Sequence, residues 1–211
     1  MKVHLLAGDR VFRYNQVIHH LKGASGMKWL VLLTGCGLGD GSCIEETVLT
    51  YTALDKYGCD YLPVAEDTQA PAVNHITEQP EEMRSVLTEA ARLGRGRIRP
   101  LDKVDPAEYD ALVIPGGLGL LRDCRTSGTA ELVRQFAARG KRIGTMCAGI
   151  DFLRAVLGPQ VLQGLAEITP ADGFCRDADG AFFYTPAFRR TGSCHIIQQG
   201  IDGMIRAMQA T

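Results

Sequence analysis

Short apolar runs alternate along the chain with longer segments in which apolar residues recur every three or four positions. The first run, residues 28–34 (KWLVLLT), is almost continuously apolar, as expected for a parallel strand that is buried on both faces. The intervening segments have the spacing of amphipathic helices. The predicted strands are 28–34, 60–65, 110–115 and 143–146, and the predicted helices are 44–55, 129–139 and a segment that begins at residue 150. This alternation predicts an α/β fold with an open, mostly parallel sheet and helices on both faces.

The remaining segments are less regular. Residues 66–80 are polar and contain two prolines, so we expect a long loop with little structure of its own, followed by a helix over 81–93. Pro100 restricts residues 97–101 to a short strand at the edge of the sheet. Two further short strands, 167–175 and 181–185, are predicted around the tight turn DADG at 177–180, and a last helix begins at residue 192 or 193.

Composition excludes several classes of protein. The chain has 211 residues, of which 45% are apolar and 22% are charged, as in a globular domain with a substantial core. The formal net charge is -1, so no nucleic acid or anionic membrane is expected as a partner. No apolar run approaches the ~20 residues of a membrane-spanning helix, and no signal peptide is recognisable at the start.

The chain divides into two parts of different character. Residues 27–211 contain the alternating pattern and are expected to form a single domain, whereas residues 1–26 read as an N-terminal appendage. That appendage either packs on the domain or reflects a start site assigned too early, and a partner-binding or dimer helix is the alternative. Seven cysteines occur, without a CxxC pair, which argues against a disulfide framework or structural zinc and for a reducing cytoplasm.

The most informative stretch surrounds Cys147. A short buried strand ends there and a helix begins within three residues, so the cysteine is expected at a sharp turn with its sulfur at the helix N-terminus. Unpaired backbone N–H groups and the positive end of the helix dipole would favour the thiolate, and the same N–H groups could hold an oxyanion. A buried structural cysteine is the alternative, because free cysteines are often buried.

A glycine-rich loop follows the first predicted strand. Its sequence, GCGLGDGS at 35–42, lacks the GxGxxG spacing and the lysine of a nucleotide-binding loop. Ser42 and Glu45 have the spacing of a capping box for the next helix, which places Glu46 in the first helical turn. In that turn the carboxylate of Glu46 either interacts favourably with the positive end of the helix dipole or faces a cleft.

A third turn follows the predicted strand 110–115. The glycines of Pro115-Gly116-Gly117 expose backbone N–H groups that could contribute an oxyanion donor. The carboxyl ends of parallel strands share one edge of the sheet, where sites of such folds lie. We therefore expect Glu46, the Gly116–Gly117 turn and Cys147 to be neighbours, which favours a nucleophile over a buried structural thiol.

Several longer strings resemble the ThiJ/PfpI superfamily, and within it the ElbB branch, whose members are named glyoxalase or isoprenoid-biosynthesis protein. The resemblance extends from about residue 27 to about residue 208. It is carried by GCGxxDGS at 35–42 with Glu46, by Asn74-His75, RSVLTEAAR at 84–92, IPGGxG at 114–119, MCA at 146–148, TPA at 185–187 and GID at 200–202.

The resemblance implies a flavodoxin-like, class I glutamine amidotransferase-like fold and a homodimer. It places the nucleophile on Cys147, its partner carboxyl on Glu46, and the oxyanion hole on Gly116, Gly117 and the N–H of Ala148. The implied reaction is the conversion of glyoxal or methylglyoxal to the hydroxy acid through a hemithioacetal, or a related deglycation, without metal or other cofactor. This is a lyase activity of the hydro-lyase class on a small aldehyde. Because a carboxylate opposes a thiolate, Glu46 is expected to be mostly protonated and to titrate jointly with Cys147.

The resemblance also nominates pocket residues and leaves alternatives open. Asp40, His75 and Arg84 lie in the matching strings and are candidate pocket residues. Position 148 is Ala where peptidase-like members have His, so a Cys–His protease dyad is not expected there. The alternative to an enzyme is a redox sensor or stress-response protein, in which the same thiol oxidises to a sulfinic acid. An amidotransferase-like hydrolase is disfavoured, because His195 is the only downstream histidine and we interpret it as structural.

Overall fold

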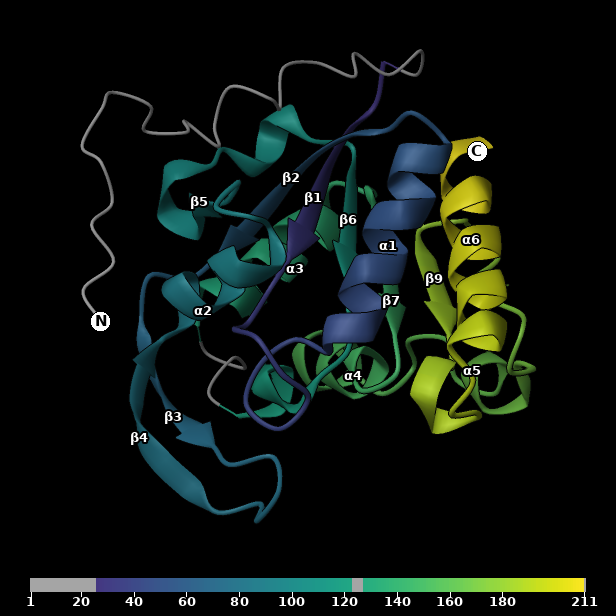
Figure 1. Cartoon of the computed structure of the whole chain (residues 1–211). Coiled ribbons are helices and arrows are strands. Elements are labelled where there is room, and N and C mark those ends of the chain that lie inside the picture. Colours follow the sequence, from purple (N-terminus) through teal and green to yellow (C-terminus); the bar gives the residue numbers. More distant parts are fainter. Residues whose placement is uncertain (1–25, 123–126, 211) are drawn as a thin grey trace, which may run out of the picture.

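The computed structural model describes residues 26–122 and 127–210 (Figure 1). The prediction for residues 1–26 therefore falls almost entirely outside the described residues. A seven-stranded sheet forms the centre, and all of its strand pairs are parallel except the pair at one edge. In spatial order the strands are β5 (Arg99–Pro100), β2 (Asp60–Ala65), β1 (Lys28–Leu32), β6 (Ala111–Ile114), β7 (Arg142–Met146), β9 (Phe182–Thr185) and β8 (Cys175–Arg176). The predicted α/β class with an open, mostly parallel sheet is confirmed.

Helices cover both faces of this sheet, as the alternation predicted. The longer helices are α1 (Ile44–Lys56), α2 (Val86–Leu93), α3 (Gly128–Ala138), α4 (Gly149–Leu157) and α6 (Cys194–Ala210), and α5 (Leu165–Ile168) is a single turn. In Figure 1, α1 and α6 lie side by side in front of the sheet. None of the described helices is long and apolar enough to cross a membrane.

The central strand β1 explains why the sheet needs cover on both sides. Trp29, Val31 and Leu33 are fully buried in the core shared with α1 and α6, while Leu30 and Leu32 are fully buried in the core shared with α3 and α4. Each such side chain contributes about 1.5–3 kcal/mol when it leaves water. A continuous apolar run is therefore the expected sequence of this strand.

One segment differs from the sequence prediction. Residues 66–80 were expected to be a structureless loop and 81–93 a helix, but the structure has an antiparallel hairpin of β3 (Gln69–Val73) and β4 (Pro80–Ser85) before α2. The helix begins only after Ser85, whose side chain accepts a hydrogen bond from the Thr88 N–H at 3.1 Å. This cap fixes the helix start, and the hairpin extends away from the sheet (Figure 1).

The C-terminal part differs in a smaller way. The strand expected over 167–175 is reduced to β8, and the residues before it include the short helix α5. The predicted turn at 177–180 joins β8 to β9, with the Gly180 N–H donating to the Asp177 carbonyl at 3.2 Å. The edge position predicted for Pro100 is confirmed, since β5 is the outermost strand beside β2.

Candidate active site

Three loops meet at the carboxyl edge of the sheet. They connect β1 to α1, leave β6 at residue 115, and connect β7 to α4. The chain places β2 on one side of β1 and β6 on the other, so the crevice between β1 and β6 is the point where ligands of such sheets bind. The predicted convergence of these loops is observed.

Cys147 occupies the sharp turn between β7 and α4. Its φ is +49°, in the left-handed region that is strained for a residue with a side chain. A Cβ on Gly149 would overlap the Thr145 hydroxyl, so the turn tolerates no larger residue two positions after the cysteine. The Cys147 N–H donates to the Thr185 carbonyl at 3.3 Å, which ties the turn to the end of β9. The sulfur is thus held at the start of α4, and the residue is 8% exposed.

Glu46 reaches the same place from the first turn of α1. Its side chain is fully buried, and Oε2 accepts a hydrogen bond from the Gly116 N–H at 2.7 Å. A Cβ added to Gly116 would lie 2.5 Å from Glu46 Oε2 and 2.8 Å from Cys147 Cβ. The carboxyl and the cysteine therefore both crowd the position that a side chain at residue 116 would take, so only a glycine fits there.

The second carboxyl oxygen of Glu46 is not held by a hydrogen bond of this kind. Glu46 Oε1 is buried and has no hydrogen-bond partner among the described residues. The Phe188 N–H and the Cys147 thiol nevertheless lie close enough to the carboxyl to influence its pKa. A buried oxygen of this kind normally finds a partner, and unpaired ones occur at functional positions.

The pKa values of Glu46 and Cys147 bear on the prediction that the cysteine is a thiolate. Burial raises the pKa of Glu46 to about 7, and the Gly116 N–H, followed by the nearby Phe188 N–H and Cys147 thiol, offsets part of that rise. Burial and then the charge of Glu46 raise the pKa of Cys147 to about 11, against a smaller lowering by the Ala148 N–H and by Arg189. The expected thiolate is therefore wrong for the resting site, because desolvation outweighs the helix N-terminus. Burial therefore favours the protonated form of both groups, which keeps the thiol protonated near neutral pH and opposes ionisation of Glu46.

The oxyanion donors also need one correction. The Gly116 N–H was expected to bind an oxyanion, but it already donates to Glu46 and so positions the carboxyl instead. Gly117 is buried in the same turn, and the Ala148 N–H acts on the Cys147 sulfur. The N–H groups of Gly117 and Ala148 remain the candidates.

The start of α1 is built differently from the expected capping box. The N-cap residue is Cys43, whose thiol donates to Glu45 Oε2 at 3.2 Å. The Ser42 hydroxyl instead accepts from the Thr34 N–H at 3.0 Å, just beyond the end of β1. The Cys43 N–H donates to the Gly116 carbonyl at 2.8 Å, so the helix start and the glycine turn are held together.

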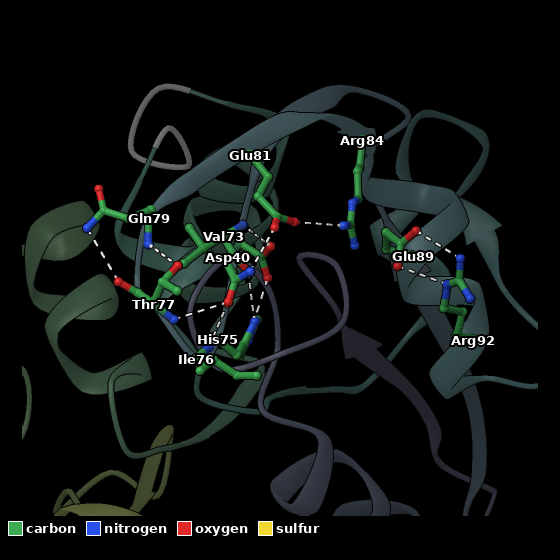
Figure 2. Close-up of polar contacts among 11 residues, drawn as sticks. Asp40, Val73, His75, Ile76, Thr77, Gln79, Glu81, Arg84, Glu89 and Arg92 are labelled. Atoms are coloured by element: carbon green, nitrogen blue, oxygen red, sulfur yellow. Dashed lines mark hydrogen bonds and ion pairs between the residues drawn. The ribbon is translucent and has the colours of Figure 1, made fainter.

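The three predicted pocket residues lie elsewhere, on the glycine-rich loop and the hairpin (Figure 2). Asp40 Oδ2 accepts from the Val73 N–H at 2.7 Å, and His75 Nε2 accepts from the Gly39 N–H at 3.0 Å. Asp40 and His75 are 3.9 Å apart, while Arg84 pairs with Glu81 at 3.2 Å on the hairpin. Asp40 and His75 fasten the hairpin to the glycine-rich loop, whereas the Arg84 pair lies within the hairpin; no described contact joins the three residues to Cys147.

Sequence reasoning missed the segment after β9. Ala187 is buried with φ at +47°, and this left-handed turn brings the Phe188 N–H toward Glu46 and Arg189 toward Cys147. Arg189 forms an ion pair with Asp151 in the first turn of α4. The string at 185–187 marked this segment, but only the fold places it beside the cysteine.

No group of three or more His, Cys, Asp or Glu side chains that could hold a metal ion occurs within residues 26–122 and 127–210.

The chain is similar to several known proteins. The family model described as "DJ-1/PfpI family" matches residues 43–161. The human mitochondrial "glutamine amidotransferase-like class 1 domain-containing protein 3" is 30% identical, over 95% of this chain and 78% of its own length. The "Deglycase PfpI" of Pyrococcus furiosus is 36% identical over 30% of this chain and 36% of its own. The crystal structure of an isoprenoid biosynthesis protein with an amidotransferase-like domain from Ehrlichia chaffeensis superposes with a TM-score of 0.77. The two proteins are 28% identical in sequence, and the match covers 86% of this chain and 98% of the Ehrlichia chain.

Proposed function

The chain belongs to the DJ-1/PfpI family, and from that premise we propose that it is a glutathione-independent glyoxalase that converts 2-oxoaldehydes to 2-hydroxy acids. One observation carries this proposal: a cysteine at a strained turn and a fully buried carboxyl from another part of the chain meet at Gly116. A related deglycation is the variant of the same chemistry suggested by the name of the Pyrococcus relative.

The first step is addition of sulfur to the aldehyde. With its pKa at about 7, Glu46 is available as a base at neutral pH, while the thiol of Cys147 keeps its proton until substrate arrives. Glu46 takes that proton as Sγ bonds to the aldehyde carbon. The Gly117 and Ala148 N–H groups hold the developing oxyanion, which is then protonated to give the hemithioacetal.

The second step moves a proton between two carbons. Glu46 removes the proton from the carbon bonded to sulfur, which gives an enediol, and returns a proton to the neighbouring carbon. The aldehyde carbon is thereby oxidised and the ketone carbon reduced, so the product is a thioester of the 2-hydroxy acid. Water cleaves the thioester and restores the thiol. Atoms and electrons balance with water as the only co-reactant, which places the reaction in the hydro-lyase class.

The test is turnover of glyoxal and methylglyoxal, with glycolate and lactate as the measured products. We expect Cys147→Ser and Glu46→Gln to reduce the rate at least about a hundredfold, the contribution of a nucleophile or general base. The exposed Cys194 and the exposed Glu45 supply matched controls, so Cys194→Ser and Glu45→Gln should keep the wild-type rate.

Running the reaction in deuterium oxide sharpens the test. A proton that passes through Glu46 exchanges with solvent, so lactate should carry deuterium at its second carbon. Product formed at equal rates by the wild type and both site variants would refute the proposal.

The redox-sensor alternative has weaker support. Peroxide reacts with thiolates, and burial together with Glu46 holds the pKa of Cys147 at about 11.

We also propose that the protein is a homodimer, since members of this family are often dimers, and that it acts in the cytoplasm. Sedimentation of the purified chain tests the first point. The human relative is named as mitochondrial, so imaging of the tagged full chain in its own cell tests the second.

A further inference from the structure

Arg189 is a cation at the site that the proposed mechanism does not use. It lies in the turn Ala187–Arg189 that follows β9, and its Nη2 pairs with Asp151 Oδ2. The Arg189 and Asp151 side chains are 39% and 42% exposed, so solvent and small solutes reach both.

Three features of the surrounding chain hold Arg189 in place. The Thr185 carbonyl accepts from the Cys147 N–H at 3.3 Å, which joins the end of β9 to the cysteine turn. The buried, left-handed Ala187 then turns the chain back over the site. Asp151 holds the guanidinium over the first turn of α4, and its positive charge acts on the Cys147 sulfur.

The guanidinium has binding capacity left. Asp151 engages Nη2, whereas Nε and Nη1 have no hydrogen-bond partner among the described residues. An arginine presents its N–H groups as a planar fork that matches a carboxylate, and such charge-assisted pairs are strong. The next residue, Arg190, is engaged differently, because it donates to the Glu167 carbonyl.

From this arrangement we propose that Arg189 binds an anionic group on the substrate, so that the preferred substrates are 2-oxoaldehydes with a carboxylate further along the chain. The inference rests on the proposed function. Asp151 lies in the first turn of α4, which begins two residues after Cys147, so the guanidinium and the sulfur lie at the same end of this helix. The carboxylate should therefore be separated from the reacting carbonyls by two or three bonds rather than attached to them.

The probe is 4,5-dioxopentanoate, whose carboxylate lies two methylene groups beyond the ketone, and its neutral methyl ester is the matched control. Addition of water to the acid gives 2-hydroxypentanedioate, with no other co-reactant. The readout is the ratio of kcat/KM for the acid to kcat/KM for the ester. Any effect of Arg189 on the thiol itself is common to both substrates and cancels in this ratio.

We expect the wild type to favour the acid about tenfold, mainly through KM, as a partly exposed arginine–carboxylate pair would provide. Arg189→Met should bring the ratio close to one, Arg189→Lys should keep part of the preference, and Arg190→Met should keep all of it. A wild type without preference for the acid, or an unchanged ratio in Arg189→Met, would overturn the inference.

A second measurement separates this inference from the glyoxalase proposal. If neither substrate is turned over, the glyoxalase proposal fails, and the anion site is judged by alkylation of Cys147 with iodoacetamide. The product 2-hydroxypentanedioate should slow alkylation of the wild type and of Arg190→Met but not of Arg189→Met. Equal protection of wild type and Arg189→Met, or protection of neither, would refute the anion site.

Discussion

Burial of Glu46 should make the protein less stable at neutral pH than in mild acid, and Glu46→Gln should remove that dependence. The pKa of this carboxyl rises from 4.5 in the unfolded chain to about 7 in the folded protein. Below pH 4.5 both states hold the proton and ionisation costs the folded state nothing. As pH rises further the unfolded chain releases the proton first, so the free energy of unfolding falls until about pH 7 and then levels.

The size of the effect follows from the two pKa values. A rise from 4.5 to about 7 on folding corresponds to about 3 kcal/mol lost between about pH 4 and about pH 8. The side-chain amide introduced by Glu46→Gln cannot ionise, so the variant lacks this loss. Its buried NH₂ group imposes a cost of its own, of about 1–3 kcal/mol, but that cost is the same at every pH.

The measurement compares the free energy of urea unfolding of Glu46→Gln with that of the wild type, at two pH values. The stability of Glu46→Gln relative to the wild type should rise by about 3 kcal/mol from about pH 4 to about pH 8. An exposed carboxyl on the hairpin provides the control, because Glu82→Gln should follow the wild type at both pH values. Parallel pH dependence in wild type and Glu46→Gln would refute the reasoning that burial raises the pKa of this carboxyl.

Three further substitutions test the surrounding structure. Gly116→Ala should abolish turnover and lower the melting temperature, because the new methyl group would lie 2.5 Å from Glu46 Oε2; an active variant would contradict the close approach. Asp40→Ala should speed amide hydrogen exchange at Val73, whose N–H it binds at 2.7 Å, while turnover falls less than about tenfold, because no described contact joins Asp40 to Cys147. Asp202→Asn should leave the midpoint of urea unfolding nearly unchanged, since the ion-pair partner Lys56 is 58% exposed and the Tyr57 hydroxyl, which donates to Asp202 at 2.7 Å, can donate to the new amide oxygen; a large fall in the midpoint would mean that the ion pair holds α6 against α1.

The sheet and the cysteine turn could be predicted because their signals are local. A continuous apolar run such as 28–34 suits a strand buried on both faces, and the change of pattern around Cys147 marks the passage from strand to helix. Parallel strands bring their carboxyl ends together, so the meeting of Glu46 with Cys147 followed from topology.

Other features depend on contacts that no local pattern records. Met83 continues the apolar face of the helix predicted over 81–93, yet segment 80–85 pairs with β3, in a hairpin that is fastened to the glycine-rich loop through Asp40 and His75. The pKa of Cys147 depends on how completely the fold excludes water, and this outweighs the helix N-terminus that the sequence suggested. Arg189 is 42 residues from Cys147 in sequence, so only the assembled fold brings it to the site.

The most direct test of a coupled thiol and carboxyl is the pH dependence of Cys147 alkylation, followed on its own peptide by mass spectrometry in wild type and Glu46→Gln. The charge of Glu46 contributes to raising the pKa of the thiol to about 11. We therefore predict that the midpoint of alkylation moves to lower pH in Glu46→Gln, even as the variant loses turnover. A midpoint that stays in place or moves upward would contradict the account, because the two groups would then not share one acid–base equilibrium.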